Sequence, residues 1–136
     1  MQLDLNQAIA ALRRLNVPVP RPRRLPTEFE VRDAEEMAGV AFHDDFRQFL
    51  LEASDVVYGT LEPITLSGGH TDFGTVLEEA RIDGVPGDLI PVCADNGDYY
   101  CITPTGEVVY WSHNGATDES WLTLATWITD VWINGN

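Results

Sequence analysis

LIPVCADNGDYYCITPTGEVVYWS, residues 89–112, is the stretch of sequence that decides the fold class. It holds three runs rich in β-branched and aromatic residues, separated by the turn sequences Asp95-Asn96-Gly97-Asp98 and Pro104-Thr105-Gly106. Turn sequences of this kind between such runs are typical of hairpins. The stretch therefore predicts a three-stranded antiparallel meander.

The positions of the apolar residues predict how these strands pair. If the first loop is Asn96-Gly97-Asp98, position 94 lies opposite position 100, and a three-residue loop at Pro104-Thr105-Gly106 continues the same face into the third strand. A two-residue Asn96-Gly97 loop would shift the register by one residue and divide the apolar set, so we favour the longer or bulged turn. The predicted face consists of Ile90, Val92, Ala94, Tyr100, Ile102, Val108 and Tyr110.

The opposite face of the meander is also too apolar to face water, since it holds Cys93, Tyr99, Cys101, Val109 and Trp111. It needs a cover, either a helix of the same chain or a partner. The natural internal cover is a helix predicted over residues 118–133, with apolar residues at helical spacing. Its apolar positions are Trp121, Leu124, Ala125, Ile128, Val131 and Trp132.

Helices are predicted upstream of the meander. Asp4 can cap a helix that ends at Asn16, and Thr27 starts a second one with Glu30 as a possible capping box. Further helices are expected from His43 or Asp44 to about residue 53, and between residues 71 and 81, while residues 56–66 resemble strands. The expected apolar face of the second helix is Phe29, Ala34, Met37 and Ala38.

Together these elements predict an α+β fold, a single domain with an antiparallel sheet of about five strands flanked by helices. Within it, residues 1–26 form an N-terminal helix and a Pro/Arg-rich strap, because residues 16–26 hold four prolines and three arginines. Residues 27–136 form the α+β domain itself.

The charge of the chain limits its partners. Its 136 residues include eight basic residues, all arginine, against 22 acidic ones, a net charge of −14. Residues 1–32 hold six arginines and three acids, a net +3, which leaves −17 for the rest of the chain. Phosphate contacts need a basic surface, so we expect neither nucleic acid nor an anionic membrane as partner. The absence of a membrane-length apolar run or a leader pattern predicts a cytoplasmic protein.

Few residues point to enzymatic chemistry. Cys93 and Cys101 are too few for a disulfide framework or a closed zinc site, so we expect free thiols, although the predicted register places them opposite each other. No metal-ligand spacing, nucleophile elbow, glycine-rich dinucleotide motif or lysine is present. The Asp95-Asn96-Gly97-Asp98 sequence is interpreted as a turn rather than a calcium loop. We therefore predict no metal, no cofactor and no catalysis.

Acidic and aromatic residues are instead the candidates for binding a basic protein. Carboxylates at loops and helix starts are displayed to solvent, and Tyr and Trp beside them suit a recognition surface, although core packing also explains the aromatic residues. Helix capping likewise explains the acids that follow His43. The predicted partner-binding residues are Asp44, Asp45, Asp55, Glu62, Asp72, Asp95, Asp98 and Trp127, the last because it lies off the main helical stripe.

Several short motifs resemble the SUKH superfamily when taken in order. They are Ala34-Glu35-Glu36-Met37-Ala38-Gly39, Asp44-Asp45-Phe46-Arg47-Gln48-Phe49-Leu50, Leu89-Ile90-Pro91-Val92, the strands and turns from Asp95 to Val108, Trp111-Ser112-His113, and Ser120-Trp121-Leu122. The resemblance covers about residues 27–133. It departs from the usual pattern at Ala41-Phe42 and at Ser54-Asp55.

That superfamily includes fungal regulators of cell-wall glucan synthesis and many bacterial immunity proteins that bind toxins. The resemblance implies a binding role without shared catalytic residues. We therefore expect an immunity protein that neutralises a toxin, a basic protein domain, through an acidic face. The alternatives are an intracellular regulator or scaffold that binds a host protein and, third, an unrecognised small hydrolase.

Overall fold

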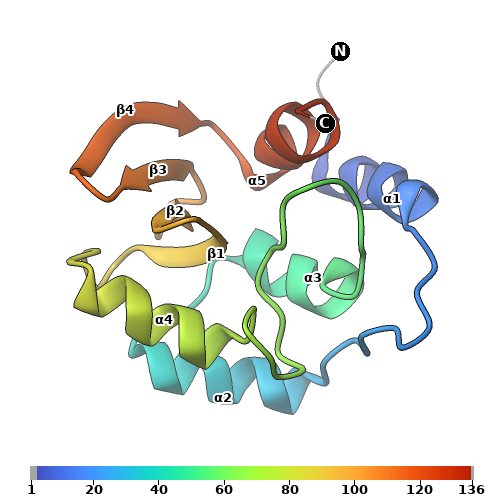
Figure 1. Cartoon of the computed structure of the whole chain (residues 1–136), viewed down its shortest axis with the longest axis horizontal. Helices are drawn as coiled ribbons and strands as arrows, with labels where there is room; N and C mark the ends of the chain where they lie inside the picture. The colour runs from blue at the N-terminus through green and yellow to red at the C-terminus, as the bar shows by residue number, and fades with distance from the viewer. Residues whose placement is uncertain (1–2, 136) are drawn as a thin grey trace.

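A computed structural model describes residues 3–135 and shows a four-stranded antiparallel sheet with helices packed on it (Figure 1). The α+β prediction is confirmed, with four strands instead of about five. The strands, in the sheet order β1-β2-β3-β4, are β1 (Ile90–Asp95), β2 (Asp98–Ile102), β3 (Val108–Ser112) and β4 (Gly115–Trp121). The helices are α1 (Leu5–Leu15), α2 (Glu28–Ala38), α3 (Asp44–Ala53), α4 (Phe73–Ile82) and α5 (Leu124–Trp127), which continues as a π-helix, η1 (Ile128–Ile133).

Residues 56–66 do not form a strand of the sheet. They run beside β1 and make an isolated antiparallel bridge between Pro63 and Cys93, where the Ile64 amide donates to the Val92 carbonyl at 3.0 Å. Pro63 has no N–H to donate, so a longer ladder cannot form through it. A second isolated bridge, parallel, joins Thr65 to Asp72, so the expected strand structure is reduced to two single bridges.

The first hairpin has a two-residue turn, which corrects the predicted longer loop. Asp95 pairs with Asp98, and the turn residues Asn96 and Gly97 have positive φ angles of 52° and 90°. A bulge at Val92, not a bulge in the turn, absorbs the shift, so that Ile90 still pairs with Ile102. The predicted apolar face is therefore kept only in part. Ala94 pairs with Tyr99 instead of lying opposite Tyr100, and Cys93 takes its place.

The bulge also corrects the predicted position of the cysteines. Cys93 pairs with Tyr100 and Cys101 pairs with Pro91, so the two thiols lie on opposite faces of the sheet. Both cysteines are free and buried, and burial raises the pKa of each thiol to about 12. Thiolate chemistry at neutral pH is therefore suppressed.

The second hairpin follows the predicted register. Tyr100 pairs with Tyr110 and Ile102 pairs with Val108 across the loop that contains Pro104-Thr105-Gly106. Gly106 has φ +94°, and a Cβ atom there would lie 2.6 Å from Nε2 of His43. This loop therefore lies against the start of α3, where the His43 ring accepts a hydrogen bond from the Asp45 amide.

Gly106→Ala should therefore destabilise the protein by about 2 kcal/mol. A left-handed backbone costs a residue with a Cβ atom about 1 kcal/mol, and displacing His43 weakens the cap of α3 by a similar amount. The control is Gly97→Ala, since Gly97 has φ +90° but no atom within 4 Å of its added Cβ. Urea unfolding of both variants measures the difference, and equal losses of stability would show that the His43 contact is unimportant.

Residues 118–121 form the end of a strand and not the start of the C-terminal helix. The His113-Asn114 turn returns the chain along β3, Ser112 pairs with Gly115, and Trp121 pairs with Val108. This pairing gives hydrogen-bond partners to the backbone groups on the free edge of β3. Residues 118–121 therefore form a strand, although the apolar residues of the segment 118–133 are spaced as in a helix. The helix begins at Leu124, after Thr123 accepts a hydrogen bond from the Thr126 amide.

The predicted limits of the first four helices are confirmed closely. Asp4 and Thr27 are both N-caps with reciprocal capping boxes, and α4 covers most of residues 71–81. The predicted apolar face of α2 is wrong in part, since its buried residues are Val31, Ala34 and Ala38. Phe29 and Met37 are instead exposed, at 68% and 57% of their surface.

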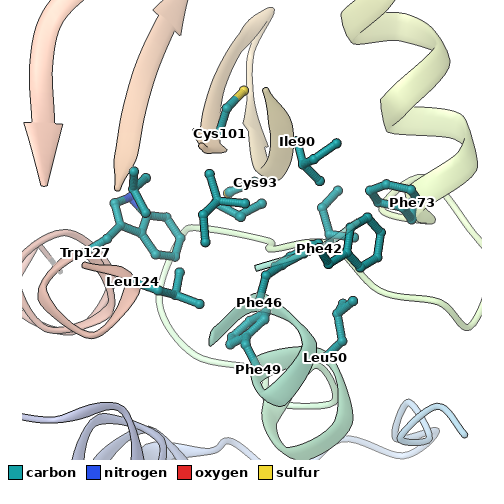
Figure 2. Packing of buried hydrophobic residues seen from close by; sticks show 14 of the residues in the cluster. Phe42, Phe46, Phe49, Leu50, Phe73, Ile90, Cys93, Cys101, Leu124 and Trp127 are labelled. Carbon is teal, nitrogen blue, oxygen red and sulfur yellow. The ribbon is translucent and has the colours of Figure 1, made fainter. Parts of the chain in front are cut away.

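Both faces of the sheet are covered by helices, which forms one continuous core. On the Tyr100 face, side chains from α3 and α5 converge beneath the strands, including Phe46, Phe49, Leu124 and Trp127 (Figure 2). On the opposite face α4 packs against β1, and the Tyr99 hydroxyl donates to Asp83, the residue that caps the end of α4, at 2.6 Å. The cover of this second face is therefore α4 and not the predicted C-terminal helix.

The N-terminal residues pack on the rest of the chain. The helix α1 lies against α3 and the C-terminal helix, with Ala8 and Leu12 fully buried (Figure 1). Arg13 binds Asp55 at 2.6 Å, and in the strap Arg24 binds Glu30 while Arg23 lies 4.0 Å from Glu62. None of the helices within residues 3–135 is long and apolar enough to cross a membrane.

Candidate functional site

The rings of four residues meet on the Tyr100 face of the sheet. Tyr100 lies centrally, with its ring centroid 4.9 Å from Tyr110, 5.7 Å from Trp121 and 5.3 Å from Trp127. Trp127 is fully buried under the sheet, whereas the other three rings are half-buried. The three outer rings therefore form a supported aromatic surface, since their packing limits their rotation.

Carboxylates surround this aromatic surface. Burial raises the pKa of the Tyr100 hydroxyl, and the negative charges of Asp95, Glu119 and Asp98 raise it further. Burial and the hydrogen bond to Asp98 raise the pKa of Tyr110 in the same direction. Asp95 and Asp98 thus raise the pKa of both tyrosines, whereas Glu119 raises that of Tyr100.

Asp98 organises the turn end of this surface. Its carboxylate accepts the Tyr110 hydroxyl at 2.6 Å and the His113 backbone amide at 2.7 Å, and it lies 2.9 Å from the His113 ring. The hydrogen bonds from Tyr110 and His113 lower the pKa of Asp98 below its ordinary value. Asp98 therefore joins two hairpins, β1–β2 and β3–β4, through its ionised form.

Asp98→Asn should lower stability at pH 7 by about 1 kcal/mol, because it removes a charged acceptor at a solvent-accessible site. Because the pKa of Asp98 is lower in the folded protein than in the unfolded chain, where it is about 3.9, ionised Asp98 stabilises the fold above that pH. This stabilisation is lost as the pH falls through the folded-state pKa. The parent and variant should therefore converge in acid. Thermal unfolding from pH 7 to pH 2.5 tests this, with the exposed Asp88→Asn as control, and a constant difference across that range would contradict it.

We define the acidic–aromatic patch as Tyr100, Tyr110, Trp121, Asp95, Asp98 and Glu119. Within residues 3–135, Asp95 and Glu119 make no ion pair with a basic side chain. Their charges are thus available to an external cation, and the neighbouring rings offer flat surfaces for guanidinium or ammonium groups. The patch therefore combines unpaired negative charge with exposed aromatic surface.

The predicted binding residues do not form one site. Asp95 and Asp98 lie in the patch, whereas Asp44 and Asp45 lie at the start of α3, near the opposite end of the sheet. Asp72 caps α4 through the Gly74 amide, and Asp55 binds Arg13. Glu62 lies beside β1, where it binds His70 at 2.7 Å.

The prediction that Trp127 contacts a partner is wrong. Its side chain is 0% exposed and packs against Tyr100 and Trp132, at 5.3 Å and 6.3 Å between ring centroids. Its position off the helical stripe followed from a helix assumed to start at Asp118, and the real helix is shorter with a π-helical continuation. Trp127 supports the patch from below and does not reach solvent.

Glu119 and Trp121 belong to the patch although the sequence reasoning placed them in a helix. The signal that could have found them is Ser112-His113-Asn114-Gly115, a turn sequence directly after a strand. It predicts a fourth strand whose side chains return along the third. The sequence predicts binding by Tyr and Trp residues in general and does not single out Trp121.

Metal and nucleophile chemistry find little support in the geometry. Among residues 3–135, no group of three or more histidine, cysteine or carboxylate side chains could hold a metal ion. The His43 ring serves as a helix cap, and both thiols are buried.

Comparison with known proteins identifies a family and a similar solved structure. The model of the SUKH_5 family, described as SMI1-KNR4 cell-wall, matches residues 5–133. A crystal structure of a protein from Pseudomonas syringae pv. tomato is 42% identical, with a TM-score of 0.90, and the match covers 95% of this chain and 98% of that one. No curated protein matches. The family match includes α1, which lies upstream of the residues that carried the resemblance.

Proposed function

The chain belongs to the SUKH_5 family, and on that premise we propose that it is a non-enzymatic immunity protein that neutralises a bacterial toxin by binding it through the acidic–aromatic patch. The proposal rests on family membership for the class of function. For the surface it rests on one observation, the half-buried ring of Tyr100, which packs against Tyr110 and Trp121 and whose pKa is raised by burial and by the charges of Asp95 and Glu119.

The mechanism is occlusion of a basic toxin surface. A toxin whose substrate is anionic presents basic residues around its site, and a chain of net charge −14 attracts such a surface from a distance. Close to contact, Asp95 and Glu119 pair with individual cations. Tyr100 and Trp121 then exclude water from those pairs, which strengthens them.

The experiment that tests this proposal starts with the immobilised protein and extracts of its source cell. The protein retained is identified, expressed alone, and then expressed together with this chain. We expect a partner that arrests growth alone and a 1:1 complex that restores growth. A retained partner that is harmless when expressed alone would instead support a regulator or scaffold.

A matched pair of variants locates the binding surface in the same assay. Asp95→Asn with Glu119→Gln removes two patch charges, and Asp98 is kept because it holds the hairpins together. Glu52→Gln with Asp88→Asn removes two exposed charges elsewhere. Growth should be restored by the second pair and not by the first, and equal restoration by both would place the interface outside the patch.

A further inference from the structure

A trough lies between α2 and α4, the two helices drawn along the lower side of Figure 1. Its larger end is a hollow of about 500 Å³ lined by Met37, Gly74, Leu77, Glu78, Arg81 and Ile82. A smaller hollow of about 180 Å³ continues past Met37 and Gly74 toward Leu66 and Asp33. The trough is separate from the acidic–aromatic patch, which lies on β1–β4.

The walls of the trough expose apolar side chains that a folded domain normally buries. Ile82 is 77% exposed and Met37 is 57% exposed, and both line the larger hollow. Phe29, two turns before Met37 on α2, is 68% exposed but lines neither hollow. Gly74 leaves the floor open, since a Cβ atom there would lie 3.1 Å from the Met37 sulfur. Exposed apolar side chains beside a hollow are typical of an interaction surface.

The rim of the trough carries negative charge. Asp33 and Glu78 line the two hollows, and the structure shows no ion pair for either carboxylate with a basic side chain in the described part of the chain. The one arginine in the lining, Arg81, donates to the Ala38 carbonyl at the end of α2. The trough therefore combines an apolar floor with two available carboxylates.

The occupant is limited by charge and by backbone chemistry. A second copy of this chain would bring two acidic rims together, which a net charge of −14 opposes. An extended segment would leave its backbone groups unpaired against helical walls, whereas a helix satisfies its own. Because α4 has ten residues, the trough is about 15 Å long and holds about three helical turns.

We propose that the α2–α4 trough binds the apolar face of a basic amphipathic helix of a partner protein. Apolar residues at positions i, i+4 and i+7 of that helix lie over Met37, Leu77 and Ile82, and flanking arginines or lysines reach Asp33 and Glu78. This docking surface stands independently of the toxin-binding proposal, since it uses other residues and a different form of recognition.

The test uses a fluorescein-labelled peptide of 14 residues with leucines on one helical face and arginines on the other. A scrambled peptide of the same composition, without an apolar face, controls for charge alone. Fluorescence anisotropy should show 1:1 binding of the amphipathic peptide and about tenfold weaker binding of the scrambled one. Equal affinity for both peptides would overturn the proposal, because it would show attraction by net charge only.

Neutral substitutions then test the trough itself. Met37→Gln with Ile82→Gln removes apolar surface without changing the charge, and should weaken binding of the amphipathic peptide about tenfold. Leu122→Gln is the control, since Leu122 is 73% exposed but does not line the trough. The proposal would be overturned if the double variant bound the peptide as tightly as the parent, or if Leu122→Gln weakened binding as much as the double variant. It would also be overturned if the parent formed a dimer that the double variant abolished.

Discussion

Trp127→Ala is expected to destabilise the protein by about 4 kcal/mol, the cost of removing a fully buried indole from a core. Trp127 joins Tyr100 on the sheet to Trp132 in the C-terminal helix, so its loss leaves a cavity between two layers that no single side chain can fill. Thermal unfolding should show a midpoint more than about 10 °C below that of the parent.

Trp127→Phe is the matched control for this prediction. The indole nitrogen of Trp127 is buried and, among the described residues, has no hydrogen-bond partner. The change to phenylalanine therefore loses volume and no hydrogen bond, and should cost about 1–2 kcal/mol. If Trp127→Ala were as stable as Trp127→Phe, the ring would not be the support of the patch that the structure indicates.

The rate of association with the toxin should fall steeply as salt increases. Charges in solution attract over about 8 Å at physiological ionic strength, whereas aromatic contacts act only after docking, so dissociation should change less. Asp95→Asn with Glu119→Gln should reduce the association rate at low salt about tenfold. Once the partner has been identified by capture, stopped-flow measurements from low to high salt give the association rates of the parent and of the variant.

Two variants give this rate measurement its controls. Glu52→Gln with Asp88→Asn removes the same charge away from the patch, and should change the rate less than the patch variant. Asp44→Asn with Asp45→Asn tests the second acidic group, at the start of α3. An association rate of the parent that does not vary with salt would show that the acidic surface serves solubility and not recognition.

Local signals in the sequence predicted the parts of the fold that depend on neighbouring residues. The N-caps Asp4 and Thr27 accept hydrogen bonds from amides three residues ahead, so spacing alone identifies them. The register of the second hairpin also follows from a short loop and alternating side chains. These features need no knowledge of the rest of the chain.

Features that depend on distant partners were predicted less well. Both Phe29 with Met37 and Val31 with Ala34 and Ala38 give α2 an apolar stripe, and only the position of the core decides between them. The strand β4 forms because β3 has a free edge, which the helical spacing of residues 118–133 does not reveal. The bulge at Val92 likewise depends on distant residues. The two-residue turn shifts the register by one residue, and the bulge restores the pairing of Ile90 with Ile102 in the core.

The candidate site shows the same division. Asp95 and Asp98 were found because a turn displays them, whereas Glu119 depends on the pairing of β4 with β3. Trp127 was misplaced because exposure is set by the packing of the helix on the sheet. Residues displayed by a local turn can therefore be predicted from the sequence, whereas residues placed by strand pairing or by helix packing cannot.

Hydrogen exchange of the free protein and of its complex with the captured toxin tests the central proposal most directly. The strand β4 is the edge of the sheet, so its outward amides exchange readily in the free protein and report a bound partner. The toxin should slow exchange in residues 95–98 and 115–121, on the two strands that carry Asp95 and Glu119. Unchanged exchange in both segments, with protection elsewhere, would contradict binding through the acidic–aromatic patch.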